Sequence, residues 1–157
     1  MTSNKSLALC LVASMIVCTL PFRAVAAEPI PSVMGTWHAK FKFQTRQGIS
    51  DCGGTLTITQ QSEHLFRGTF SWSVDPATSI RADVNRRVGQ KGTEDVLGLL
   101  AWDNKSISMA DAGDKGYWSG QLVDDQTMKL IYTESQRHAA VFRATFVRKK
   151  EQAKPAE

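Results

Sequence analysis

The sequence lacks the short motifs that mark many enzymes and metal proteins. It contains no Gly-x-Ser-x-Gly nucleophile elbow and no Asp-x-Asp-x-Asp-Gly run of the kind that binds calcium. None of the three histidines, His38, His64 and His138, is followed two or four residues later by another metal ligand. We therefore expect no bound metal and no cofactor. The absence of a catalytic motif favours a protein without enzymatic activity over an enzyme.

Internal disulfide bonds are also excluded. Two of the three cysteines, Cys10 and Cys18, lie in an N-terminal apolar segment, so Cys52 remains alone after it. A single cysteine has no partner within its own chain. Because no low-pKa context surrounds Cys52, we expect an inert thiol, with pairing between two chains as the alternative.

The N-terminal segment has the pattern of a cleavable signal peptide. Lys5 gives a short basic start, residues 7–20 are mostly apolar, and Ala24-Val25-Ala26 supplies the small-x-small cleavage step. Residues 1–26 are therefore predicted to be removed after Ala26, which places the mature chain in the periplasm or outside the cell. The apolar run is short and interrupted for a membrane span, so we expect no stable membrane insertion, with an uncleaved anchor as the alternative.

Neither sign of charge dominates the mature chain. Lys5 and Arg23 leave with the signal peptide, so 17 of the 19 basic residues face 15 acidic ones, and the net charge becomes +2. This excess is too small to predict binding to nucleic acid or to a membrane surface. One basic cluster, Arg148-Lys149-Lys150, precedes a polar tail at residues 151–157 that is predicted to be disordered.

A period of two runs through most of the chain. Residues 37–43, Trp-His-Ala-Lys-Phe-Lys-Phe, alternate between apolar and polar side chains, as in a strand with one buried face. Similar runs follow at residues 55–59, 66–72, 80–85, 96–102, 107–109, 117–123, 128–134 and 139–147. The run at 96–102 is apolar on both faces, which predicts a central strand or one covered by a neighbour. No segment has the pattern of a long helix.

Turn-forming residues separate these runs at intervals of about ten residues. Gly, Asp and Asn supply the positive φ that tight hairpins need, and they cluster at 47–48, 53–54, 75–76, 89–92, 103–104, 111–114 and 124–125. Short hairpins throughout favour an all-β, antiparallel up-and-down β-barrel of about eight strands over a Greek-key sandwich. The barrel domain is predicted to span residues 34–150, after an extended lead-in at residues 27–33.

Several motifs resemble those of the avidin and lipocalin barrels, the calycins. Gly35-Thr36-Trp37 opens the first strand, as a Gly-x-Trp does in those families, where the Trp plugs the closed end. Ala101-Trp102-Asp103-Asn104 and Tyr117-Trp118-Ser119-Gly120-Gln121 are similar to an avidin strand pair. Arg67-Gly68-Thr69-Phe70 is similar to another avidin strand. The resemblance implies a closed barrel with Trp37 packed in its core.

The polar contacts of a biotin site do not carry over. Ala39 and Phe43 stand where the avidin family binds the polar end of biotin. A site loses orders of magnitude in affinity when such partners are missing, so we expect no strong biotin binding. The resemblance does place Trp102, Tyr132 and Phe142 where that family has the aromatic side chains of its pocket wall.

Aromatic residues make the candidate ligand-binding site: Phe70, Trp72, Trp102, Trp118, Tyr132 and Phe142. A barrel of about eight strands has an interior wide enough for packed side chains or for one small ligand. Aromatic walls are common in such cavities, and simple core packing is the alternative for the same residues. Glu134 would add a carboxylate at the mouth if its strand face points inward. We favour instead a strand-end carboxylate that is solvated or paired with Arg137 or Arg143.

Three hypotheses of function follow, in this order. The first is an exported barrel that binds a hydrophobic or aromatic small molecule in its cavity without chemistry. The second is an exported inhibitor or host-interaction factor that binds a protein partner through the loop at residues 86–94 and the basic C-terminus, which rests on analogy with other barrels. A homo-oligomer is a further possible assembly. The third is a barrel cyclase or isomerase that uses Glu134 as its acid or base.

Overall fold

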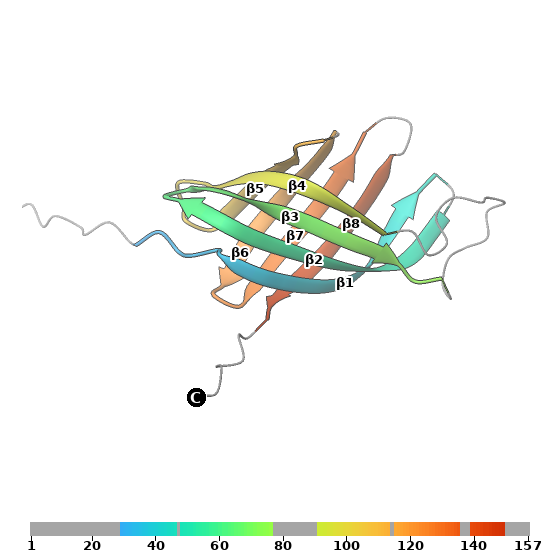
Figure 1. Cartoon of the computed structure of the whole chain (residues 1–157), viewed down its shortest axis with the longest axis horizontal. Helices are drawn as coiled ribbons and strands as arrows, with labels where there is room; N and C mark the ends of the chain where they lie inside the picture. The colour runs from blue at the N-terminus through green and yellow to red at the C-terminus, as the bar shows by residue number, and fades with distance from the viewer. Residues whose placement is uncertain (1–28, 47, 77–90, 114, 136–138, 150–157) are drawn as a thin grey trace, which may run out of the picture.

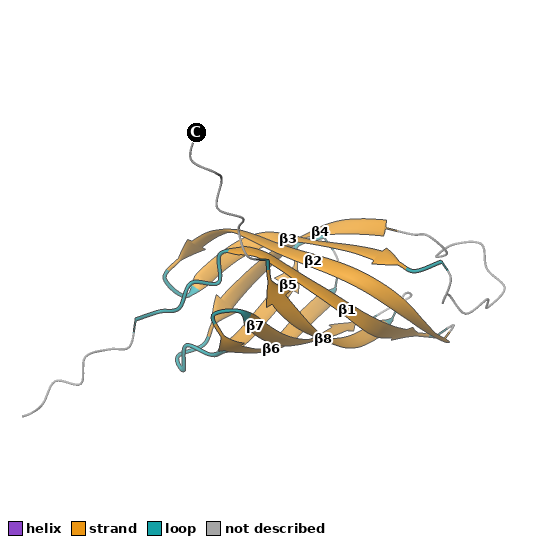
Figure 2. Cartoon of the chain, turned by 90° about the horizontal axis from the view of Figure 1, so that it is seen from below, coloured by secondary structure: helices purple, strands orange, loops and turns teal. Residues whose placement is uncertain are grey.

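Eight antiparallel strands follow one another around a closed barrel, each paired with its neighbours in the sequence. The computed structural model describes residues 29–46, 48–76, 91–113, 115–135 and 139–149. The strands are β1 (Gly35–Thr45), β2 (Gly48–Ser62), β3 (Leu65–Val74), β4 (Lys91–Leu100), β5 (Ser106–Asp111), β6 (Gly116–Asp124), β7 (Thr127–Glu134) and β8 (Ala140–Arg148). This arrangement, shown in Figures 1 and 2, confirms the predicted up-and-down barrel.

Some sequence predictions lie outside the described residues. They are the signal peptide at 1–26, the run at 80–85, most of the loop at 86–94, and the tail at 151–157. In the part of the chain that the structure describes, no helix is long and apolar enough to cross a membrane.

The first strand closes the barrel, because it pairs on both of its edges. It pairs with β2 along its whole length, from Gly35 opposite Ile58 to Thr45 opposite Gly48. On its other edge it pairs with β8, for example through Trp37 opposite Arg148. The β1–β8 pairs lie at both ends of the contact, at Trp37 and His38 and again from Phe43 to Thr45, and they close the sheet into a barrel. Figure 1 shows the consequence in space, with β1 to β4 crossing in front of β5 to β8.

Trp37 plugs the end of the barrel where the chain enters β1 and leaves β8. Its side chain has no exposed surface, and its Nε1 donates a hydrogen bond of 3.0 Å to the Val33 carbonyl. The Arg148 guanidinium carbon lies 4.3 Å from the indole centroid, in the geometry of a cation–π contact. The same guanidinium donates to the Ser32 carbonyl, which ties the lead-in across this end. The prediction that Trp37 packs in the core is confirmed.

Two local predictions about strands are wrong. The run at 96–102 is not covered on both faces, because β4 ends at Leu100 and its outward side chains Leu97 and Leu99 are 55% and 41% exposed. The glycines at 53–54 form no turn but lie inside β2, which continues to Ser62. Glycine occurs both in tight turns and inside strands, where it allows another group to approach the backbone closely. Gly54 is of the second kind, because the rings of Phe41 and Phe70 lie against it.

Trp37 and Trp102 form a matched pair for testing the plug. We expect Trp37→Ala to lower the free energy of unfolding by about 3–5 kcal/mol, because it leaves a large cavity in the core. Trp102 is 96% exposed, so Trp102→Ala should change the same quantity by no more than about 0.5 kcal/mol. Urea unfolding followed by circular dichroism measures both variants. Equal effects of the two substitutions would contradict the assignment of Trp37 as the plug.

Candidate functional site

A cavity of about 210 Å³ lies inside the barrel. It is at the end opposite Trp37, where β1 passes into β2 and β7 passes into β8. Six strands contribute its lining, which consists of Phe41, Phe43, Cys52, Phe70, Trp72, Glu94, Tyr132, Glu134, Ala140 and Phe142. The period of two brings these side chains together, because alternate residues of every strand point into a closed barrel.

Two inward-facing glycines make room for the aromatic wall. A Cβ added at Gly54 would lie 2.8 Å from the ring of Phe70 and 2.9 Å from that of Phe41. A Cβ added at Gly92 would lie 2.8 Å from the indole of Trp72. Sequence analysis assigned both glycines to turns, but they lie in β2 and β4, where the missing side chains let large rings occupy the interior.

Stacked rings form one wall of the cavity. The centroids of Phe41 and Phe142 lie 4.1 Å apart with an angle of 14° between the ring planes. Tyr132 stacks on Phe142 at 5.0 Å and 26°. Such pairs are worth about 0.5–1.5 kcal/mol beyond the area that they bury. The wall is therefore held in shape by the protein's own contacts, before any ligand arrives.

Trp118, on β6, lies opposite Tyr132 in the strand register and packs against this wall. Its ring is 4.7 Å from Phe70, edge to face, and 4.7 Å from Tyr132. Only 2% of Trp118 is exposed, and it does not line the cavity. The sequence pattern predicted that Trp118 is buried. It could not show whether the side chain lines the cavity or packs in the core beside it.

A buried carboxylate holds Trp118 and Tyr132 in place. Asp111 accepts a hydrogen bond of 2.9 Å from Trp118 Nε1 and one of 3.0 Å from the Tyr132 hydroxyl. Burial, together with the charge of Asp111 and this hydrogen bond, raises the pKa of Tyr132 well above its usual value. The phenol therefore stays protonated and acts as a donor. Sequence analysis placed Asp111 in a turn, which is wrong: it is the inward-facing last residue of β5.

The structure brings together four of the predicted site residues at the cavity. They are Phe70, Trp72, Tyr132 and Phe142. Trp102 does not belong to the wall: β4 ends before it, and the side chain is 96% exposed outside the barrel. The prediction that Trp102 lines the pocket is therefore corrected, because an apolar run does not reveal where its strand stops.

Phe41, Phe43, Cys52 and Ala140 line the cavity without having been among the predicted site residues. The alternation of residues 37–43 already carried the signal for the two phenylalanines, since Trp37, Phe41 and Phe43 share one strand face. No comparable signal exists for Cys52 and Ala140, whose small side chains are equally common in plain core packing.

Two carboxylates also reach the cavity. Glu134 and Glu94 line it from β7 and β4, and both side chains are half-buried. Glu134 is the last residue of β7, so it is a strand-end carboxylate as predicted, but it is half-buried at the cavity and not fully solvated. Its inward direction follows from parity, because it lies two residues after the buried Tyr132 on the same strand.

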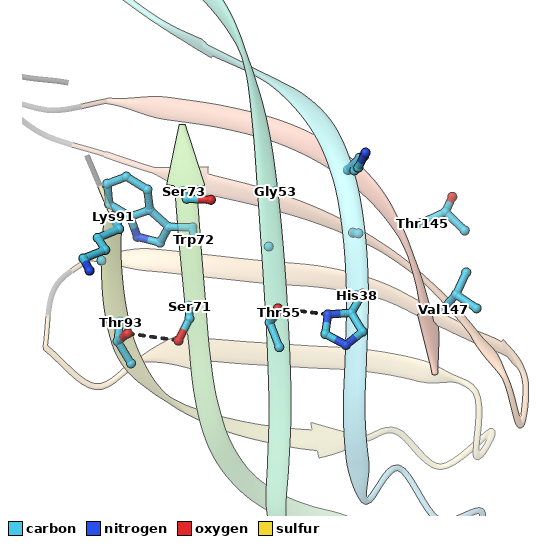
Figure 3. A pocket seen from close by; sticks show the side chains of 14 residues that line it. His38, Gly53, Thr55, Ser71, Trp72, Ser73, Lys91, Thr93, Thr145 and Val147 are labelled. Atoms are coloured by element: carbon cyan, nitrogen blue, oxygen red, sulfur yellow. Dashed lines mark hydrogen bonds between the residues drawn. The ribbon is translucent and has the colours of Figure 1, made fainter. Parts of the chain in front are cut away.

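A second depression lies on the outer face of β1 to β4 and β8, as Figure 3 shows. Its side chains are mostly small and polar, and several already bond to one another. Ser71 and Thr93 share a hydrogen bond of 2.9 Å, and His38 Nδ1 lies 3.0 Å from the Thr55 hydroxyl. Trp72 lines both this groove and the inner cavity. The groove faces solvent, so the inner cavity is the better candidate for a small ligand.

An exposed apolar patch lies on the outside near the closed end. Leu65 and Leu99 are direct partners across β3 and β4, and Leu97 follows on the same outer face. The fully exposed Trp102 comes soon after, with its ring 6.2 Å from that of His64. Patches of this kind often mark protein contacts, so the hypothesis of a protein partner stays a prediction.

The acidic turn residues show no sign of metal binding in the described part of the chain. No group of three or more His, Cys, Asp or Glu side chains there is arranged to hold a metal ion. Asp103 instead accepts hydrogen bonds from the backbone of Lys105 and from both the backbone and hydroxyl of Ser106. These bonds lower the pKa of Asp103 to about 2 and stabilise the turn after β4.

Comparison with known proteins identifies no family. No protein-family model matches the sequence, and no curated protein matches it. Similar solved structures include a de novo designed fluorescence-activating β-barrel with 16% identity and a TM-score of 0.45, covering 79% of this chain and 97% of that one.

Two further structures are similar at the same level. A redesigned β-barrel bound to DFHBI has 14% identity and a TM-score of 0.47, covering 76% of this chain and 98% of its own. An S-type phycobiliprotein lyase from Guillardia theta has 10% identity and a TM-score of 0.44, covering 76% and 90%. Similarity this low says nothing about a ligand, and membership of the avidin or lipocalin families stays a prediction.

Cys52 offers a chemical test of the cavity wall. Burial raises the pKa of its thiol to about 11, against a smaller opposing effect of a hydrogen bond with the Ser73 backbone. Since the thiolate is the reactive form, alkylation at pH 8 should be about a hundredfold slower in the native chain than in urea. The exposed Ser73→Cys position in a Cys52→Ser background is the control and should react rapidly. Native Cys52 reacting as fast as that control would contradict its placement.

Proposed function

We propose that the mature chain is a non-catalytic binding protein that takes one small hydrophobic or aromatic molecule into the cavity of the barrel. The observation that carries the proposal is the unfilled space beside the stacked rings of Phe41, Phe142 and Tyr132. Apolar and aromatic linings with a few convergent polar groups are typical of small-molecule sites.

The size of the cavity supports a small occupant. A cavity of about 150 Å³ is enough to hold benzene, so about 210 Å³ suits one aromatic ring with a short substituent. Larger molecules would have to extend beyond the mouth. The hydrogen bonds of Asp111 with Trp118 and Tyr132 hold the aromatic wall in place, which lowers the ordering cost of binding.

Export of the chain is part of the same proposal. It is supported by the basic start, the apolar run and the small-x-small step at Ala24-Val25-Ala26. We expect the chain recovered from the periplasm or the medium of an expressing bacterium to begin at Ala27. Intact-mass measurement decides this, and an unprocessed chain that begins at Met1 in the same fraction would contradict cleavage.

The Ala140 position tests whether binding occurs inside the barrel. Ala140→Phe should fill part of the cavity and weaken the binding of a neutral probe such as toluene at least about tenfold, because the ring competes for the same space. Val141→Phe is the matched control, since Val141 follows on the outer face of β8 and is 45% exposed. Isothermal calorimetry measures both affinities, and circular dichroism checks that both variants fold.

Tryptophan fluorescence gives an independent readout of the same binding. Trp72 lines the cavity, whereas Trp102 lies outside it. Ligand-induced quenching should therefore diminish in Trp72→Phe and persist in Trp102→Phe. Failure of neutral and charged single-ring compounds alike to bind would overturn the proposed function, as would equal binding by the Ala140 and Val141 variants.

A further inference from the structure

The charged side chains of the cavity are all of one sign. Among the described residues that line it, Glu94 and Glu134 are the charged ones, and none is Lys, Arg or His. The remaining lining is aromatic or small. A ligand in the cavity therefore contacts apolar side chains, aromatic ring faces and two carboxylates. The two negative charges favour one charge on the ligand over the other.

The two carboxylates act on one place, although they come from different strands. Glu94 lies on β4 and Glu134 on β7, which are not neighbours in the barrel. Both negative charges, after burial and Asp111, contribute to raising the pKa of the Tyr132 phenol. Glu94 and Glu134 are therefore within electrostatic reach of the same hydroxyl group on the cavity wall, so one ligand group near Tyr132 would feel both.

Basic side chains on the neighbouring strand positions point away from the cavity. Lys42 lies between two inward phenylalanines and forms an ion pair of 2.7 Å with Asp51 on the outer face. Lys91 is exposed and lines the outer groove seen in Figure 3. Arg143 follows the inward Phe142 and is exposed. Parity thus directs these three cations outward and leaves the two carboxylates inside.

The carboxylates have capacity to bind a ligand cation in addition to their existing contacts. Glu94 and Glu134 each have a further interaction within the protein. A carboxylate offers about four acceptor sites, so an ammonium group can join such an arrangement without displacing it. The faces of Phe41, Trp72 and Phe142 add to this preference, because an aromatic face attracts a cation.

We propose that the cavity selects a small aromatic cation, in which one ring stacks on the aromatic wall and a protonated amine or quaternary ammonium group lies at Glu94 and Glu134. This inference rests on the proposed function and adds the charge of the ligand to it. A neutral ligand of the same shape leaves the carboxylates without this partner. An anionic one must be held against two like charges.

Three probes of similar shape and different charge test the inference: 2-phenylethylamine, 2-phenylethanol and phenylacetate. Calorimetry with the full mature chain at neutral pH should give an affinity for the amine at least tenfold higher than for the alcohol, and weakest binding for phenylacetate. The comparison uses the native chain, so its outcome does not depend on whether a variant folds.

Variants then assign the selectivity to the two carboxylates. Glu94→Gln and Glu134→Gln should each weaken binding of the amine several-fold, and the double variant should bring amine and alcohol within about threefold of each other. Asp95→Asn removes the same charge from the outer face of β4, next to Glu94, and should leave the tenfold preference intact. Binding of the alcohol should be unchanged in all of these variants.

The outcomes separate this inference from the proposed function. Equal or tighter binding of the alcohol, or preference for phenylacetate, overturns the selection for a cation while the binding function stands. Persistence of the preference in the double glutamine variant, or its loss in Asp95→Asn, assigns the preference to overall charge and overturns the site. Absence of binding by all three probes overturns the inference together with the proposed function.

Discussion

Pairing of β1 with both β2 and β8 is the constraint on which the rest of this structure depends. Closure of eight strands sets the interior to roughly the width of packed side chains or one small ligand. Every inward position then competes for the same limited space. The interior is therefore filled or left open according to the sizes of the inward side chains, and the exterior has little influence on it.

That competition has opposite results at the two ends. At the closed end, Trp37 and Phe146 are completely buried among branched side chains, and Arg148 packs over the indole. At the other end, glycines at 54 and 92 make room for large rings, Phe41 and Phe142 stack on each other, and a cavity remains beside the small Ala140. One interior thus combines a packed plug with a cavity.

Polar groups inside the barrel divide into two kinds. Asp111 is buried and accepts hydrogen bonds from Trp118 and Tyr132, so it stabilises the positions of both side chains. Glu94 and Glu134 are half-buried and line the cavity itself. A buried carboxylate is costly unless it is hydrogen-bonded, which explains why the deepest one accepts from both aromatic donors.

The sequence by itself determined the all-β class, the antiparallel order and the burial of Trp37, because period-two patterns and hairpin residues are local properties. It also identified Phe70, Trp72, Tyr132 and Phe142 as inward residues. Only the tertiary structure decided that Trp102 lies outside, that Asp111 points inward, and that a cavity remains. The end of a strand depends on its pairing with neighbouring strands, and the empty volume depends on side chains from six strands. Neither property can therefore be predicted from one segment of the sequence.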